Sequence, residues 1–107
     1  MPTQGDLCVA FVGTKQRRCV ILRVDAQTDA AGVVDVRLLV IAGTSTPGEP
    51  SILIDHKERT GRNLQLQWPT YFRKGYIAVV RAEKVKLLPG RCSPERLFAL
   101  LDLVGVR

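Results

Sequence analysis

Residues 33–42 read Val-Val-Asp-Val-Arg-Leu-Leu-Val-Ile-Ala, and this stretch decides the class of fold. Its first part alternates valine with charged residues, as on a strand that has one face in water. Its second part, residues 38–42, is continuously apolar, as on a strand whose two faces are both covered. Residues 43–50 hold two glycines, hydroxyl residues and two prolines, and therefore predict a loop. We expect the core to form around this strand.

The rest of the chain repeats this patterning in shorter pieces separated by Gly and Pro. Residues 13–17 have the length of a hairpin connection. Residues 25–32 and 55–63 are polar and predict exposed turns. Apolar residues alternate with glutamine over residues 64–68, which predicts a half-buried strand ended by Pro69. The predicted strands are residues 7–12, 18–24, 33–42, 51–54, 64–68, 76–81 and 85–88.

The C-terminal segment has a helical period. Ser93 supplies a hydroxyl N-cap, Pro94 suits the first helical position, and Glu95 lies near the positive end of the helix dipole. Apolar residues then recur at helical spacing until Gly105. The sequence predicts a helix over about residues 93–104 whose apolar face covers the sheet or a partner subunit. That face is made of Leu97, Phe98, Leu100, Leu101 and Val104.

A length of 107 residues corresponds to a single domain, residues 1–107. Several short strands followed by one helix predict a mainly β fold. We expect a small, curled, antiparallel SH3-like β-barrel with a C-terminal α-helix.

The net charge of +6 is unevenly placed along the chain. Residues 1–53 carry five basic and five acidic groups, whereas residues 54–107 carry eleven basic and five acidic groups. A basic half favours an anionic partner, most often a nucleic acid. The alternative is that scattered Lys and Arg residues only keep a small protein in solution.

Other composition signals exclude some classes. The three cysteines, Cys8, Cys19 and Cys92, match no zinc pattern and are expected to be buried free thiols in a reducing cytoplasm. No metal or cofactor site is expected. No apolar run approaches the roughly 20 residues that span a bilayer, and no signal peptide precedes the first strand. The sequence therefore predicts a cytoplasmic protein without a membrane partner.

Two motifs carry the candidate chemistry. Arg17 opens one predicted strand, and Thr44 and Ser45 follow the end of another. A guanidinium beside hydroxyl groups is a place where a phosphate binds, provided that the fold brings them to one rim of the barrel. The alternatives are a solvated hairpin arginine and a pair of loop-capping hydroxyls.

Aromatic and basic residues alternate later in the chain. Trp68, Tyr71, Phe72 and Tyr76 lie close in sequence to Arg73 and Lys74, and rings interleaved with cations can stack nucleobases and hold phosphates. Trp68 and Phe72 are expected in the core, which leaves Tyr71 as the expected exposed ring. His56 is the only histidine and, in a charged loop, is expected to be merely exposed.

The order of these pieces resembles the PemK/MazF family of toxin ribonucleases over residues 5–104. Gly5-Asp6-Leu7 resembles the opening strand of that family, and Arg17-Arg18-Cys19-Val20-Ile21-Leu22 resembles its Arg-Pro-apolar strand. Gly43-Thr44-Ser45 is similar to its strand-end Thr-Ser. Pro69-Thr70-Tyr71-Phe72 resembles the Pro-Thr-x-Phe stretch of one branch.

The resemblance implies a metal-independent endoribonuclease that cuts single-stranded RNA through the RNA's own 2′-hydroxyl. It implies catalytic roles for Arg17, Thr44 and Ser45, an antitoxin protein as partner in a type II toxin–antitoxin system, and a homodimer. Arg18, next to Arg17, is also expected to contact RNA. Arg18 stands where the family has proline, and the loop before Arg17 is short and lacks an acid. These departures favour the alternative, a non-catalytic SH3-like binding module or mobile-element inhibitor that holds a nucleic acid or another protein.

Overall fold

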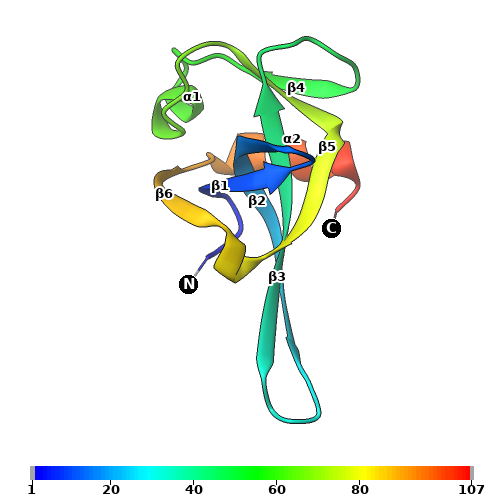
Figure 1. Cartoon of the computed structure of the whole chain (residues 1–107). Coiled ribbons are helices and arrows are strands. Elements are labelled where there is room, and N and C mark those ends of the chain that lie inside the picture. The colour runs from blue at the N-terminus through cyan, green and yellow to red at the C-terminus, as the bar shows by residue number, and fades with distance from the viewer. Residues whose placement is uncertain (1, 107) are drawn as a thin grey trace.

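The computed structural model describes residues 2–106, which form one curled antiparallel sheet and a C-terminal helix (Figure 1). Within these residues the strand order is β4-β5-β3-β2-β1-β6. The mainly β, curled architecture is as predicted, and the edge strands β4 and β6 are not paired with each other. The elements are β1 (Asp6–Val12), β2 (Lys15–Thr28), β3 (Val34–Thr44), β4 (Ser51–Ile54), α1 (Arg59–Asn63), β5 (Thr70–Arg81), the 3₁₀ turn η1 (Ala82–Lys84), β6 (Lys86–Arg91) and α2 (Pro94–Val104).

The curl follows from irregular pairing along the longest strands. The register between β2 and β3 shifts between Ile21 and Arg23, and the register between β3 and β5 shifts between Ile41 and Gly43. Such bulges bend a strand and increase its local twist. The sheet is therefore curled, with one of its two faces on the inside of the curl.

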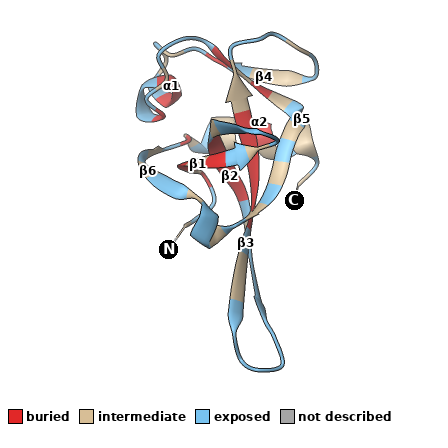
Figure 2. Ribbon diagram, viewed as in Figure 1, coloured by how far each residue is buried: buried red, intermediate tan, exposed pale blue. Residues whose placement is uncertain are grey.

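The continuously apolar runs are explained by two cores, one on each side of the central strands. In β3, Leu39 and Ile41 face the core under α2, whereas Leu38, Val40 and Ala42 face the inside of the curl. Figure 2 shows the buried segments gathered along the central strands β1, β2 and β3. The expectation that both faces of residues 38–42 are covered is confirmed.

The far halves of β2 and β3 form a two-stranded arm that leaves the body of the molecule (Figure 1). Residues 25–32 were expected to be one exposed turn, but β2 continues to Thr28 and the turn is confined to residues 29–33. Asp29 closes that turn, because its Oδ1 accepts hydrogen bonds of 2.9 Å from the backbone N–H groups of Ala31 and Val33. Water reaches most side chains of the arm, and its β2 part, residues 25–28, lacks the apolar alternation that marks a half-buried strand.

The predicted strand over residues 64–68 is wrong. The segment is a turn that follows the short helix α1, which replaces part of the turn expected at residues 55–63. Leu64 is buried, but Gln65 has a φ of 57°, which breaks any extended run. Trp68 was expected in the core and is 55% exposed. Apolar alternation here reflects a tight turn that buries Leu64, and not a strand.

The C-terminal helix is confirmed. The Ser93 side chain accepts a hydrogen bond from the N–H of Arg96, and Gly105 ends the helix with a φ of 82°. Leu100 is buried and its helical neighbours pack on the core, so the helix covers the sheet of its own chain. Phe98, expected on the apolar face, is 73% exposed. Among residues 2–106, no helix has the length and apolar character needed to cross a bilayer.

Candidate functional site

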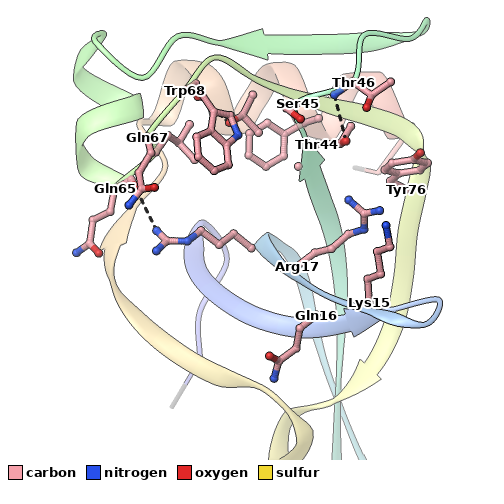
Figure 3. A pocket seen from close by; sticks show the side chains of 15 residues that line it. Lys15, Gln16, Arg17, Thr44, Ser45, Thr46, Gln65, Gln67, Trp68 and Tyr76 are labelled. Atoms are coloured by element: carbon pink, nitrogen blue, oxygen red, sulfur yellow. Dashed lines mark hydrogen bonds between the residues drawn. The ribbon is translucent and has the colours of Figure 1, made fainter.

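A groove of about 600 Å³ opens at the rim where β2 begins and β3 ends (Figure 3). Pairing between β2 and β3 stops at Cys19 and Ala42, and the first residues of β2 pair with β1 alone. Continuing the register by two residues would set Arg17 opposite Thr44. The groove lies between these diverging strand ends and the segment after α1. Its lining residues are Lys15, Gln16, Arg17, Arg18, Gly43, Thr44, Ser45, Thr46, Gln65, Leu66, Gln67, Trp68, Thr70, Phe72 and Tyr76.

The lining combines positive charge with hydroxyl groups. Three of its side chains are cationic, and none of its residues is Asp, Glu or His. The predicted meeting of Arg17 with Thr44 and Ser45 therefore occurs at one groove. Guanidinium, ammonium and hydroxyl donors without a competing carboxylate favour an anionic ligand, above all a phosphate. The hydroxyls are those of Thr44, Ser45, Thr46, Thr70 and Tyr76.

Arg17 is held by an aromatic ring. Its guanidinium carbon lies 5.2 Å from the centre of the Tyr76 ring. The Arg73 guanidinium carbon lies 4.8 Å from the centre of the same ring, and Arg73 Nη1 donates a 3.2 Å hydrogen bond to the Tyr76 hydroxyl. Cation–π contacts orient a guanidinium without using its N–H donors. Within the described residues Arg17 makes no side-chain hydrogen bond or ion pair, so those donors remain available to a ligand.

Thr44 combines a structural contact with a free donor. Its Oγ1 accepts a 3.2 Å hydrogen bond from the backbone N–H of Thr46 and so stabilises the start of the loop. The hydroxyl proton of Thr44 is not used in that bond and can still be donated. Ser45 follows it and is exposed. The loop-capping interpretation and the ligand-binding interpretation are therefore compatible for Thr44.

The floor of the groove depends on Gly43, which has no side chain. A Cβ at Gly43 would lie 2.5 Å from Cγ2 of Thr70 and 3.2 Å from the Phe72 ring. Thr70 is itself fixed, because its Oγ1 donates a 3.0 Å hydrogen bond to the carbonyl of Trp68. Gly43 thus allows β5 to approach the end of β3 closely.

Arg18 has protein partners. Its Nη1 donates to the carbonyl of Leu64 at 3.3 Å and to the carbonyl of Gln65 at 3.0 Å. These bonds tie the start of β2 to the segment after α1. In this structure the guanidinium expected to contact RNA holds one wall of the groove.

The other predicted contacts lie outside the groove lining. Tyr71 is half-buried in β5 opposite Thr44, and Lys74 is exposed in the same strand, where its backbone N–H donates a 3.0 Å hydrogen bond to the carbonyl of Pro50. Arg73 reaches the groove only through Tyr76. His56 was expected to be exposed but is half-buried, with its Nδ1 3.1 Å from Oδ1 of Asp55, and it does not line the groove.

Most of the groove lining lies outside the sequence-based site, including Lys15, Trp68 and Tyr76. Lys15 had a detectable signal, because residues two apart on a strand share a face and Lys15 stands two before Arg17. Figure 3 shows both side chains pointing toward Tyr76. Trp68 also had a signal, its place among aromatic residues beside Arg73 and Lys74, but the strand-like spacing of residues 64–68 favoured the core for it.

The cysteines are buried free thiols, as predicted. Cys8 and Cys19 face each other across β1 and β2, and the hydrogen bond between them lowers the pKa of Cys8 and raises that of Cys19. Burial raises the pKa of the Cys92 thiol to about 11, so it stays neutral near pH 7. In the part of the chain that the structure describes, no three His, Cys, Asp or Glu side chains are grouped to hold a metal ion.

Comparisons with models of protein families, with curated proteins and with solved structures find no match to this chain. The assignment of function therefore depends on the geometry of the groove.

Proposed function

We propose that this protein is a metal-independent endoribonuclease that cuts single-stranded RNA in the groove between β2 and β3, as a toxin of the PemK/MazF type. The observation that carries the proposal is the meeting of Arg17, Thr44 and Ser45 at one rim that has no acidic lining residue. These are the residues that the sequence resemblance assigned to catalysis. They come from the start of β2 and the end of β3. They can share one ligand only because these two strand ends lie at the same rim.

The chemistry needs only what RNA and this rim supply. The 2′-oxygen attacks the adjacent phosphorus, a bond from that oxygen to phosphorus forms, and the bond from phosphorus to the 5′-oxygen breaks. The products are a 2′,3′-cyclic phosphate and a 5′-hydroxyl. Arg17 stabilises the charge that grows on the phosphoryl oxygens, and the Thr44 hydroxyl donates to one of them. The 2′-hydroxyl proton leaves to water, and water protonates the departing 5′-oxygen.

The test is incubation of the purified protein with end-labelled single-stranded RNA in the presence of a chelator. We expect cleavage with cyclic-phosphate ends, and resistance of RNA that carries a 2′-deoxy sugar at the cut site. Arg17→Ala and Thr44→Ala should each slow cleavage by roughly 10²–10³-fold, the scale for losing one preorganised donor. The double variant should be little slower than either single one, because both groups serve one transition state.

His56→Ala is the matched control, since His56 lies outside the groove lining. It should leave the rate unchanged. Intact RNA after prolonged incubation with folded wild-type protein would contradict the nuclease proposal.

A second candidate function is a non-catalytic groove that binds single-stranded RNA. The observation that favours it is the absence of Asp, Glu and His from the described groove lining, which leaves no side chain suited to accept the 2′-hydroxyl proton at neutral pH. A filter-binding measurement with the same labelled RNA separates the two functions, because a binding module retains the RNA on the filter without cutting it.

Two partners complete the proposal. A toxin of this type requires an antitoxin, and a protein that covers Arg17 and Thr44 would block the groove. We also propose that the protein acts in the cytoplasm as a homodimer.

A further inference from the structure

The groove has two ends of different chemistry. At one end the Lys15 and Arg17 side chains point toward Tyr76, and at the other end lie Trp68 and Gln67 (Figure 3). Trp68 is 55% exposed, although an indole has more apolar surface to bury than any other side chain. A phosphate bound at the cationic end would make no use of this apolar surface. Phosphate binding therefore does not explain why an exposed indole lies at the other end of the groove.

The segment that carries Trp68 is held in place on several sides. Arg18 binds the carbonyls of Leu64 and Gln65, and the backbone N–H of Leu66 donates a 2.9 Å hydrogen bond to the carbonyl of Gly61. The hydroxyl of Thr70 donates to the carbonyl of Trp68 itself. An exposed ring on a preorganised backbone binds a flat ligand at a low cost in conformational entropy.

We propose that Trp68 is the platform on which one nucleobase stacks while Lys15 and Arg17 hold a neighbouring phosphate, and that the Gln67 amide hydrogen-bonds to the edge of that base. The ligand class rests on the proposed function, a single-stranded nucleic acid. A single strand is required because the base faces of a duplex are already stacked. A protein segment fits this groove less well, because most of the lining is cationic, hydroxyl or amide.

Arg18 acts in this proposal as a positioning residue. It stands next to Arg17 in β2, but its guanidinium reaches two backbone carbonyls of the Trp68 segment. Both bonds are donated by one nitrogen of its planar guanidinium, Nη1, and the shorter lysine keeps the positive charge without placing a donor at that position. Arg18→Lys should therefore weaken base stacking as much as Arg18→Ala does, whereas a residue that only attracts phosphate would be largely rescued by lysine.

The experiment uses Trp68 as its own reporter, because it is the only tryptophan in the chain. The full chain is titrated with a dye-labelled 2′-O-methyl oligoribonucleotide, which cannot be cut, and with an oligonucleotide of equal length that has abasic sites throughout. Dye anisotropy reports binding, and an unlabelled copy of each oligonucleotide is used to follow indole fluorescence. We expect both to bind in a salt-sensitive manner, and only the base-bearing one to quench Trp68.

Substitution separates the two ends of the groove. Trp68→Ala should weaken binding of the base-bearing oligonucleotide by roughly 5- to 100-fold, the range for one stacked base, and leave the abasic one unchanged. Trp68→Phe should keep part of the affinity. Phe98→Ala is the matched control, since Phe98 is an exposed ring on α2 that does not line the groove. It should change neither affinity.

Each outcome decides a different claim. Salt-sensitive binding without quenching, with equal affinity of Trp68→Ala, overturns the stacking platform and leaves the nuclease proposal intact. Quenching by the base-bearing oligonucleotide together with uncut RNA supports the platform and overturns the nuclease proposal. Failure of both oligonucleotides to bind overturns both.

Discussion

At the scale of single residues, the groove depends on Gly43, because glycine leaves free the space that a side chain would fill. A Cβ at Gly43 would meet Thr70 Cγ2 at 2.5 Å, and Thr70 cannot turn away without breaking its hydrogen bond to Trp68. Gly43→Ala should lower the free energy of unfolding by about 1–3 kcal/mol, the usual cost of overpacking. Urea denaturation followed by circular dichroism measures it.

Gly75→Ala is the comparison for this prediction. A Cβ at Gly75 has no heavy atom within 4 Å, and the residue does not have a positive φ. This variant should unfold within about 1 kcal/mol of the wild type, or be slightly more stable, because alanine reduces the entropy of the unfolded chain. Equal losses for the two variants would show that the space at Gly43 is not limiting.

At the scale of elements, a part-buried hydroxyl pair joins α2 to α1, beside the ion pair between Arg96 and Glu58. Thr60 Oγ1 donates a 2.6 Å hydrogen bond to Ser93 Oγ, which also caps α2. Ser93→Ala removes the cap, worth about 1 kcal/mol, and leaves the buried Thr60 hydroxyl without its acceptor, which costs about 1–3 kcal/mol more. Thermal or urea unfolding should show a total loss of about 2–4 kcal/mol.

A double-mutant cycle isolates the pair. Thr60→Val removes the donor and keeps the cap, so it should cost less than Ser93→Ala. Adding Thr60→Val to Ser93→Ala should cost little or restore stability, because no hydroxyl is then left unpaired. Additive losses would mean that the two hydroxyls act independently.

At the scale of the whole molecule, β5 leaves an apolar strip exposed. Ile77 and Val79 pair with Ile41 and Leu39 of β3. The two β3 residues lie in the core under α2, whereas Ile77 and Val79 are 39% and 60% exposed. Such a strip is suited to a self-complementary interface. We expect a dimer of the 11.8 kDa chain in sedimentation equilibrium, and Val79→Lys should shift it toward the monomer.

Val33→Lys serves as the control, because Val33 is also 60% exposed but stands at the tip of the β2–β3 arm. It should leave the sedimentation mass unchanged. A wild-type mass of one chain over a wide concentration range would refute the dimer. Dissociation by Val33→Lys and not by Val79→Lys would move the interface to the arm.

The sequence alone was sufficient for the central strand pieces, both covered faces of residues 38–42 and the helix from Pro94 to Val104. These features are encoded locally, in period-two or helical spacing and in the hydroxyl, proline and glycine residues that begin and end an element. They were readable because each signal lies within about a dozen neighbouring residues.

The groove was decided by the tertiary structure. Arg17 and Thr44 lie 27 positions apart, and only the β2–β3 register and the bulge beside Gly43 bring them to one rim. Charge counted along the chain pointed to the second half, yet the three cations of the lining all come from the first. Trp68 was assigned to the core because its spacing matched a strand, whereas the bonds that Arg18 makes across the chain hold it in a turn. Contacts between distant residues depend on how the strands pair, and local sequence patterns do not contain that information.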